Sequence, residues 1–449
     1  MPATGCWATL KCSQYGKRLD PSTPTGGDEP GARTTTSDQS EATMPFFRRR
    51  PPFALMVING ALCTIAILVF ARLSYGLVLP AMRDGLGLSN AQAANLSTVN
   101  ALGYLLLVMV AGVFAARFGG KTSVVLGLML VTGGFFGLAH ASDFVPILLL
   151  MLVLGMGTAF GYTPLISLLA NTFPHRRGAV IGFANSGVGL GMLLVGLIVP
   201  AMTERSADQG WRDVWLLFAA GGLAVLVMSM LILRNPLDRS ASASPKVRAK
   251  DLPVFRNPHV ITVGLVYGVQ GLTYIVQTTF MYSYALESGV PALTTGHLVS
   301  MMGIMSVFTG PLWGGLADRL GYSNSLVLAM TLSLVGTALP VLWPVQPMFV
   351  AHFLILGLCI SGLFTSILAA STETVAPHQA AVAVSFVTLF YAVGQLIGPA
   401  AASLIIEWSG GFRATFAATS VVLALGVYLG HRSRRYQQMP PQTCAGLAD

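Results

Sequence analysis

The chain has 449 residues, of which 54% are hydrophobic and only 10% are charged, whereas ordinary soluble domains carry about a quarter charged residues. Together with the positive mean hydropathy, this composition excludes a soluble fold. The net charge of +9 is no indication of nucleic-acid binding, because the cytoplasmic loops of membrane proteins also collect Lys and Arg. The five cysteines show no C-x-x-C spacing, so neither a disulfide framework nor a zinc site is expected.

The N-terminal stretch differs in composition from the rest of the chain. Residues 1–45 are rich in Gly, Pro, Ser and Thr and show no apolar periodicity, a composition that cannot bury enough surface to become ordered. We therefore expect a disordered N-terminal extension at 1–45. Met44, just before Arg48–Arg50, is a natural start for a membrane protein, and on this hypothesis residues 1–43 are dispensable.

Twelve apolar stretches follow, each long enough to cross a bilayer as a helix. The first six are predicted at 53–80, 91–116, 121–141, 144–172, 177–203 and 212–234. The second six are predicted at 258–287, 293–317, 323–343, 346–372, 378–407 and 412–431. A linker at 235–257, rich in Ser, Pro, Lys and Arg, separates them, and a tail at 432–449 ends the chain. The sequence thus predicts an all-α polytopic membrane protein with two six-helix halves, 46–234 and 258–431.

A short charged hinge occurs once in each predicted half. The pattern G-x-(L/F)-A-(D/A)-R-x-G is found at 112–119 and again at 314–321, 202 positions later. Arg212 and Arg413, near the start of the last span of each half, repeat at an offset of 201. These matches predict two halves of the same topology, and such parallel repeats rock about a site at their interface. The residues expected to form gating loops are Gly112, Arg117, Gly119, Lys121, Gly314, Asp318, Arg319 and Gly321.

The distribution of basic residues predicts the orientation of the spans. Placing both termini and the linker in the cytoplasm puts Lys and Arg into nearly every cytoplasmic loop and leaves few outside, in agreement with the positive-inside rule. Four tryptophans then fall at the outer ends of spans, where we expect an aromatic belt. They are Trp211, Trp215, Trp343 and Trp408.

Polar groups inside a bilayer are costly and are therefore the first candidates for function. Arg72 lies within the first span, where it can provide a fixed positive charge that holds an anionic group of a substrate in a central cavity. The alternative is an arginine that snorkels to the outer headgroups or pins neighbouring carbonyls. Tyr75 lies about one turn further on and would share its face.

The seventh span carries the densest polar stripe of the chain. Tyr267, Gln270, Tyr274 and Gln277 are spaced by 3, 4 and 3 residues and so line one face of a helix. A Gln facing lipid would leave its amide unsatisfied, so this face is expected to contact protein or water. Cavity lining is the preferred interpretation, and hydrogen bonding between helices is the alternative.

Two shorter pairs extend the candidate site. Asn100 and Tyr104 lie four residues apart in the second span, as do Tyr391 and Gln395 in the eleventh. Each pair alone is more often a helix-packing contact than a ligand contact. We include both pairs because spans 1, 2, 7 and 11 would all border a central cavity in this architecture.

Carboxylates are placed only at the edges of the predicted spans. All 17 Asp and Glu residues lie in tails, loops or span ends, and we interpret Glu287, Glu373, Glu407 and His352 as interfacial. Without paired acids, a nucleophile or a metal-spaced cluster inside the membrane, we expect neither an enzyme nor a metal site nor a cofactor. The G-x-G pairs follow no strand, which excludes a nucleotide-binding fingerprint.

The hinge between the second and third spans of each half resembles the signature loop of the major facilitator superfamily. Five segments are similar to its YbfB/YjiJ-type branch: 72–82, 100–105, 186–191, 274–280 and 394–399. The resemblance covers about 53–431. It implies the major facilitator fold and a secondary transporter of the bacterial inner membrane that works by alternating access, with proton coupling as the usual mode.

Two positions depart from the family pattern. Many members carry an arginine in the fourth span that is tied to proton coupling, whereas Met151–Gly155 contains none. Efflux-type members have Gly-Pro in the fifth span, where this chain has Gly189-Leu190. The coupling ion and the direction of transport therefore stay open.

The leading hypothesis is a secondary transporter for a small organic solute, anionic if Arg72 is its anchor, with the seventh-span stripe supplying specificity. The alternative is a membrane sensor or scaffold that uses the same fold without translocating anything. The expected partners are the solute, the lipid bilayer and protons, with no nucleic acid, and we expect the protein to act as a monomer.

The two hinges differ at one position that bears on gating. Asp318 can face the positive start of the fifth span, near Arg177 and Gly178, when the cytoplasmic side closes. Ala116 cannot do the same for the eleventh span. The sequence predicts an asymmetric latch, and the alternative is that Asp318 only caps a solvated turn.

Overall fold

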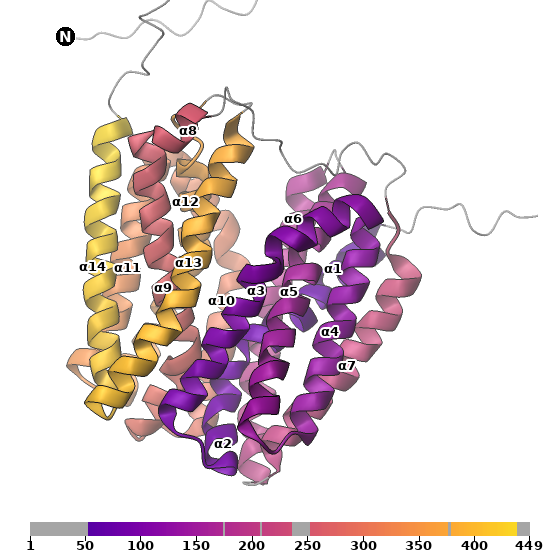
Figure 1. The fold of residues 1–449 in the computed structure, drawn as a ribbon. Helices are drawn as coiled ribbons and strands as arrows, with labels where there is room; N and C mark the ends of the chain where they lie inside the picture. Colours follow the sequence, from indigo (N-terminus) through magenta and orange to yellow (C-terminus); the bar gives the residue numbers. More distant parts are fainter. Residues whose placement is uncertain (1–52, 174–175, 207–208, 236–251, 376–378, 438–449) are drawn as a thin grey trace, which may run out of the picture. The chain divides into compact units, whose positions relative to one another are not determined.

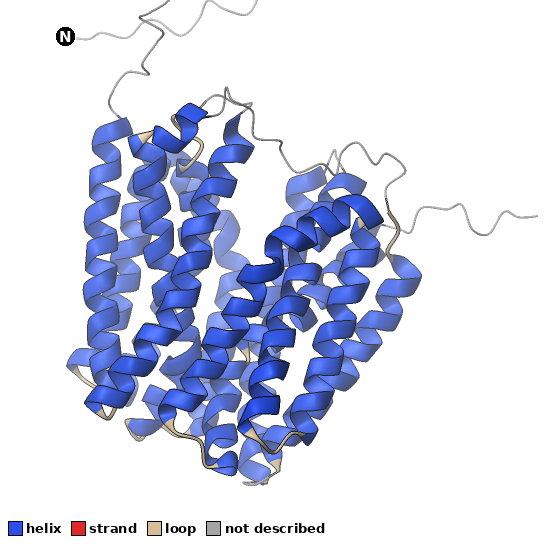
Figure 2. Cartoon of the chain, viewed as in Figure 1, coloured by secondary structure: helices blue, strands red, loops and turns tan. Residues whose placement is uncertain are grey.

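A computed structural model describes residues 53–173, 176–206, 209–235, 252–375 and 379–437. The predicted N-terminal extension, most of the linker and the end of the C-terminal tail lie outside these residues. The described residues are helical apart from short turns (Figure 2). All of the described residues belong to one compact unit.

The described part of the first half contains seven α-helices and one π-helical segment. Their bounds are α1 (Phe53–Thr64), the π-helical segment (Ile65–Leu73), α2 (Tyr75–Leu86), α3 (Asn90–Phe118), α4 (Gly120–His140), α5 (Phe144–Thr172), α6 (Arg177–Arg205) and α7 (Gly210–Ile232). After the linker come α8 (Leu252–Arg256), α9 (Pro258–Glu287), α10 (Ala292–Leu320), α11 (Tyr322–Leu342), α12 (Gln346–Ala370), α13 (Ala380–Ser409) and α14 (Phe412–Gln437) (Figure 1).

Twelve of the described helical stretches are long and apolar enough to cross a membrane, which confirms the predicted all-α, twelve-span fold class. The two ends of the series differ most from the prediction. The helix of the first span is built from three pieces and continues to Leu86, six residues beyond the predicted 80. The last helix runs to Gln437, six residues beyond the predicted 431.

The internal repeat is visible in the backbone as well as in the sequence. The hinges after α3 and α10 both turn at a glycine with positive φ, +98° at Gly119 and +84° at Gly321, a conformation that other residues rarely adopt. Arg212 of α7 donates to the carbonyls of Ala139 and Ala141 at 3.0 and 2.8 Å. Arg413 of α14 donates in the same way to carbonyls at the end of α11. In each half, one arginine thus satisfies the free carbonyls at the end of the third span.

We call the end of the helices that carries Gly119, Gly321 and α8 the linker end, and the other the opposite end. The two halves meet toward the opposite end, where α6 packs on α10. Added side-chain atoms at Gly189 and Gly196 would lie 2.6 Å from the carbonyl oxygen of Gly303 and 2.5 Å from that of Gly296. Because only glycine allows backbones to approach this closely, two pairs seven residues apart join these helices.

Toward the linker end the same helices separate. Nothing lies within 4 Å of an added side-chain atom at Gly182 of α6 or at Gly314 of α10. In the other pair of facing helices, Ser403 of α13 donates to the carbonyl of Ala91 at the opposite end (3.3 Å), and α3 and α13 diverge toward α8 (Figure 1). The halves are therefore closed at the opposite end and open at the linker end.

The predicted aromatic belt is only half correct. Trp343 and Trp408 are exposed, at 59% and 87%, as residues in the headgroup region should be. Trp211 and Trp215 are buried inside the first half, where Trp215 stacks on Phe135. A helix-end position alone does not reveal that these two rings point into the bundle.

Candidate functional site

A π-helical segment places Arg72 in the interior. The Ser74 backbone N–H donates to the Val69 carbonyl, five residues back, at 2.8 Å, so the turn around Arg72 is wider than an α-turn. Such insertions occur frequently at functional sites. No proline lies within the segment, and the sequence pattern carried no signal for this change of helix type. Arg72, the next-to-last residue of the segment, is only 8% exposed.

Arg72 is held from both halves of the protein. Its Nη2 donates to Oε1 of Gln395 on α13 at 2.8 Å, and its guanidinium lies over the ring of Tyr104 on α3, 4.8 Å from the centroid. Its Nε is buried and lacks a hydrogen-bond partner within the described part of the chain. The ion pairs recorded among the described residues involve other groups. Arg72 is thus a buried cation without a carboxylate beside it in that part of the chain.

An aromatic cluster lies next to this arginine in the second half. Tyr267 of α9 and Tyr391 of α13 stack with centroids 4.5 Å apart. Phe364 of α12 stands edge-on to Tyr274 and to Tyr391, each at 5.7 Å. Tyr274, Phe364 and Tyr391 keep part of their surface exposed, whereas Tyr267 is buried. Sequence reasoning missed Phe364, because a phenylalanine in an apolar span is indistinguishable from one that faces lipid.

Three of the predicted site residues use their polar atoms for packing. Gln277 accepts a hydrogen bond from Thr337 of α11 at 3.3 Å, and Tyr75 donates to the carbonyl of Ala93 at 2.6 Å. Asn100 donates to the carbonyls of Ala71 and Met151. These contacts favour the packing interpretation for Tyr75, Asn100 and Gln277.

The structure brings the remaining candidates to one region. Arg72, Tyr104 and Gln395 are in mutual contact through Arg72, and Tyr267, Tyr274 and Tyr391 meet around Phe364. Gln270 lies on α9 between Tyr267 and Tyr274, and its Oε1 is buried with no hydrogen-bond partner among the described residues. Their role in binding a substrate stays a prediction.

The two hinge loops make different contacts. In the first, Lys121 donates its backbone N–H to Asn235 at 2.8 Å and its Nζ to the Met230 carbonyl at 2.6 Å, which ties the loop to the end of α7. In the second, Asp318 accepts a hydrogen bond from Tyr322 at 3.3 Å. The other predicted gating residues, Gly112, Arg117, Gly314 and Arg319, lie on the last turns of α3 and α10.

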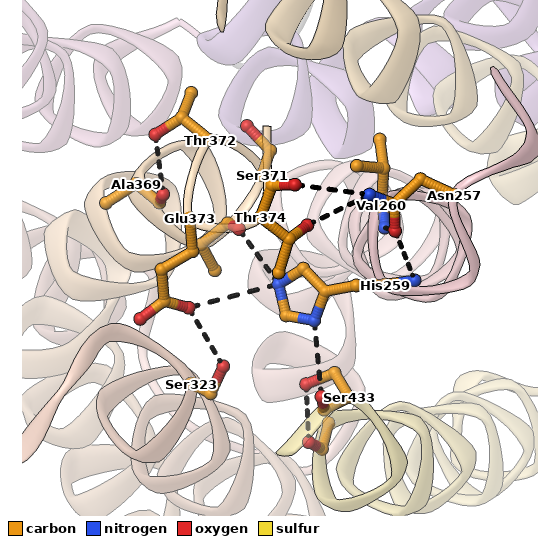
Figure 3. Close-up of polar contacts among 12 residues, drawn as sticks. Asn257, His259, Val260, Ser323, Ala369, Ser371, Thr372, Glu373, Thr374 and Ser433 are labelled. Atoms are coloured by element: carbon orange, nitrogen blue, oxygen red, sulfur yellow. Dashed lines mark hydrogen bonds and ion pairs between the residues drawn. The ribbon is translucent and has the colours of Figure 1, made fainter. Parts of the chain in front are cut away.

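A second polar cluster joins helix ends of the second half at the linker end (Figure 3). His259 of α9 is buried, with Nδ1 3.2 Å from the Ser433 carbonyl and Nε2 3.0 Å from the Ala370 carbonyl. Nε2 is also 3.9 Å from Oε2 of Glu373, which accepts a hydrogen bond from Ser323 at 3.4 Å. Sequence reasoning identified Glu373 only as interfacial and did not single out His259.

His352 and Glu287, which were also interpreted as interfacial from the sequence, lie in different surroundings from each other. His352 is wholly buried in α12, with Nδ1 2.9 Å from the Gly336 carbonyl, so its interfacial interpretation was wrong. Glu287 accepts a hydrogen bond from the first N–H of α14 at 3.4 Å, as an acid at a helix start should. No group of three His, Cys, Asp or Glu side chains that could hold a metal ion is present in the described ranges.

The family model described as "Uncharacterised MFS-type transporter YbfB" matches residues 64–430, nearly the whole membrane part. The chain belongs to the YbfB-type family of major facilitator superfamily transporters. This membership confirms the resemblance expected from the hinge and from the first-span segment that carries Arg72.

Two named relatives are distant from this chain in sequence. The chain is 24% identical over 242 residues to an MFS-type transporter of Aspergillus fumigatus, a match that covers 50% of this chain and 55% of that protein. It is also 24% identical over 335 residues to human monocarboxylate transporter 11, covering 72% of this chain and 70% of that one.

A solved structure reproduces the arrangement of the helices. A bacterial homologue of the human lysosomal transporter Spinster, in an inward-facing and unoccupied conformation, superposes with a TM-score of 0.70 at 18% identity. The match covers 87% of this chain and 99% of that one. The major facilitator fold is therefore common to both chains.

Proposed function

We propose that the protein is a secondary transporter that moves a small organic anion, of the monocarboxylate class, across the bacterial inner membrane by alternating access. The observation that carries this proposal is Arg72, a buried guanidinium without a carboxylate beside it among the described residues, at the place where the two halves meet. A buried charge that lacks an internal counter-ion is costly. An anionic solute would supply that counter-ion.

The chemistry of the guanidinium favours a carboxylate. Arg offers a planar fork of donors that matches two carboxylate oxygens, and Nε of Arg72 has no partner in the described part of the chain. Several relatives are named monocarboxylate transporters, including the human and rat proteins. This likeness supports extending the substrate class to the present chain.

The Arg72–Gln395 hydrogen bond suggests how binding is linked to movement. It joins α13 of the second half to the first span of the first half. A carboxylate that takes the place of Gln395 on the guanidinium would replace this contact with contacts of its own, and so change the relative stability of the open and closed arrangements. In this proposal the linker end is cytoplasmic, both termini lie inside, and the structure represents the inward-open state.

We also propose proton coupling, which is the usual mode in the superfamily. A carboxylate solute carried with a proton crosses without net charge transfer. In proteoliposomes, an inward proton gradient should then accelerate uptake, and a protonophore should abolish the acceleration. Uptake that is unaffected by the gradient would rule out this coupling while leaving the solute class untouched.

Uptake by variants of Arg72 tests the proposed function. Proteoliposomes with the wild-type protein should take up radiolabelled monocarboxylates, with pyruvate and benzoate as the first probes. Removing the charge in Arg72→Gln should weaken uptake about 30-fold or more, since losing one partner of a buried charged pair costs about 2 kcal/mol or more. Arg72→Lys keeps the charge without the planar fork of donors, so its uptake should lie between that of the wild-type protein and that of Arg72→Gln.

Two outcomes would contradict the proposed function. Equal uptake by wild-type protein and Arg72→Gln would exclude the anchor role. Substrate-dependent signalling to a partner protein without translocation of any solute would favour the sensor alternative.

A further inference from the structure

We infer that the solute is an aryl carboxylate, with its carboxylate on Arg72 and its flat ring against Tyr274, Phe364 and Tyr391. This inference rests on the proposed function and names the substrate class more narrowly. The aromatic cluster was not part of the argument for an anion, which came from Arg72 alone.

The first step is the distance between the anion site and the rings. Gln395, which binds Arg72 at 2.8 Å, lies four residues after Tyr391 on α13, and residues at this spacing lie on the same helix face. Tyr391 is in contact with Phe364, and Phe364 with Tyr274. The guanidinium and the rings are therefore within the reach of one small molecule that carries both a carboxylate and a ring.

The second step is the exposure and geometry of the rings. Tyr274, Phe364 and Tyr391 are each partly exposed, unlike the buried aromatic rings that form the core of the first half, such as Phe135 and Phe218. Phe364 meets both tyrosines edge-on, with interplanar angles of 89° and 78°. A flat ligand ring can stack on one of these faces while it meets another edge-on, which are the two favoured aromatic geometries.

The third step excludes burial of apolar area as the sole basis of selectivity. A saturated ring of the same size buries at least as much apolar surface as an aromatic ring, so the hydrophobic effect gives it no disadvantage. A site built from aromatic faces and edges distinguishes the two through the quadrupole of the ligand ring. Selectivity for the aromatic member of a matched pair is thus the specific consequence of the inference.

The experiment measures binding to the full-length protein in nanodiscs by calorimetry. Benzoate carries both the charge and the aromatic ring, cyclohexanecarboxylate carries the charge on a saturated ring, and benzamide carries the ring without the charge. We expect benzoate to bind roughly fivefold to tenfold more tightly than cyclohexanecarboxylate, in line with the stabilisation of aromatic pairs beyond area burial. Benzamide should bind about 30-fold more weakly than benzoate or not at all.

Variants assign the preference to the cluster. Tyr391→Leu and Phe364→Leu should each reduce the ratio of the two acid affinities toward one. The control Phe386→Leu alters an aromatic residue of the same helix α13 that packs on Phe390, and it should leave the ratio unchanged. Because both acids are measured on one preparation, the ratio does not depend on the fraction of folded protein.

The outcomes separate the inference from the proposed function. Equal affinities for the two acids, both lost in Arg72→Gln, would overturn the aryl inference and leave the anion transporter standing. The failure of benzoate to bind would overturn the inference as well. Binding of either acid that is unaffected by Arg72→Gln would contradict the anchor role itself.

Discussion

A buried guanidinium is costly unless nearby groups compensate its charge. In this state Arg72 donates to an uncharged partner, the amide oxygen of Gln395, and lies over the face of Tyr104. Both contacts are weaker than an ion pair with a carboxylate. The arrangement therefore stabilises the charge enough for folding while it leaves the arginine able to exchange partners.

Replacing the amide of Gln395 with a carboxylate tests this exchange. Gln395→Glu has nearly the same shape and places a permanent anion within 2.8 Å of Nη2. We expect the variant to fold and to lose binding of pyruvate and benzoate by about 30-fold or more, because the internal carboxylate competes with the solute. Calorimetry with the purified protein measures the loss.

The matched control is Gln395→Leu, which removes the competing acceptor without adding charge. It should bind the same acids at least as well as the wild-type protein. Undiminished anion binding by Gln395→Glu would show that the solute does not use the guanidinium.

At the scale of residues, the sequence was informative where a polar group stands alone among apolar ones. Arg72 could be identified because a charge within a span has few structural uses. Gln395 was also a candidate, but its hydrogen bond with Arg72 could not be predicted, since helical spacing places Gln395 on a face and does not say which helix that face meets. For the same reason Gln277 belonged to the predicted cavity stripe, while its amide bonds to Thr337 of α11.

At the scale of elements, the close contact between α6 and α10 depends on pairs of glycines. A glycine-to-alanine substitution therefore tests this contact directly. Gly196→Ala would place a side-chain atom 2.5 Å from the carbonyl of Gly296. Overpacking of this kind costs about 1–3 kcal/mol, so the thermal midpoint should fall and the opposite end should open more often.

Gly182→Ala is the control for this variant, on the same helix but with nothing within 4 Å. Its midpoint should stay unchanged or rise slightly, because alanine is the better helix former. Equal midpoints for the two variants, measured by thermal shift, would argue against a tight α6–α10 contact in the membrane protein.

The polar cluster that joins α9, α11, α12 and α14 at the linker end predicts that the stability of the folded protein depends on pH. Burial raises the pKa of Glu373, while His259 and Ser323 act to lower it. The folded protein therefore holds this proton to a higher pH than the unfolded chain does. The resulting stabilisation is complete below pH 4.5, the ordinary pKa of a glutamate. It is lost as the pH rises through the pKa of Glu373 in the folded protein.

Glu373→Gln removes this titration and keeps a side chain of similar shape. The thermal midpoint of the wild-type protein minus that of the variant should decrease as the pH rises from 4.5 toward neutral. A difference that increases over this range would show that ion pairing with His259 outweighs burial of the carboxyl.

At the scale of elements, the twelve spans follow from length and hydropathy alone, because apolar runs of about 20 residues match a spanning helix and are too long for a spanning strand. The π-helical segment at Ile65–Leu73 was not predictable, since it depends on how the first span packs on its neighbours. Trp211 and Trp215 were misplaced for a related reason. Their position in the chain is at a helix end, and their side chains turn inward.

On the scale of the whole molecule, the two hinges predict asymmetric gating. With the linker end open, Asp318 is bonded to Tyr322, and closure would bring it to the start of α6. Asp318→Asn removes the favourable charge at that helix start, worth about 0.3–1 kcal/mol. The access equilibrium should then shift roughly twofold to fivefold toward the linker-open state.

Ala116→Asp is the comparison in the other half and should shift the equilibrium less. Accessibility labelling of cysteines introduced near Arg72 measures both variants. Equal shifts would contradict an asymmetric latch and would favour a role for Asp318 as a simple turn cap.

The central claim is that binding of a carboxylate to Arg72 changes the distance between the two halves at the linker end. The most direct measurement is the distance between spin labels at position 113 of α3 and position 389 of α13, where Val113 and Leu389 are 68% and 52% exposed. The labels are placed in a protein whose native cysteines have been replaced. Pyruvate and benzoate are added to this protein and to its Arg72→Gln form.

We expect at least one acid to shift the distribution toward shorter linker-end distances with Arg72 present and neither to do so in Arg72→Gln. A distribution that both acids leave unchanged, or that shifts equally in Arg72→Gln, would contradict the account.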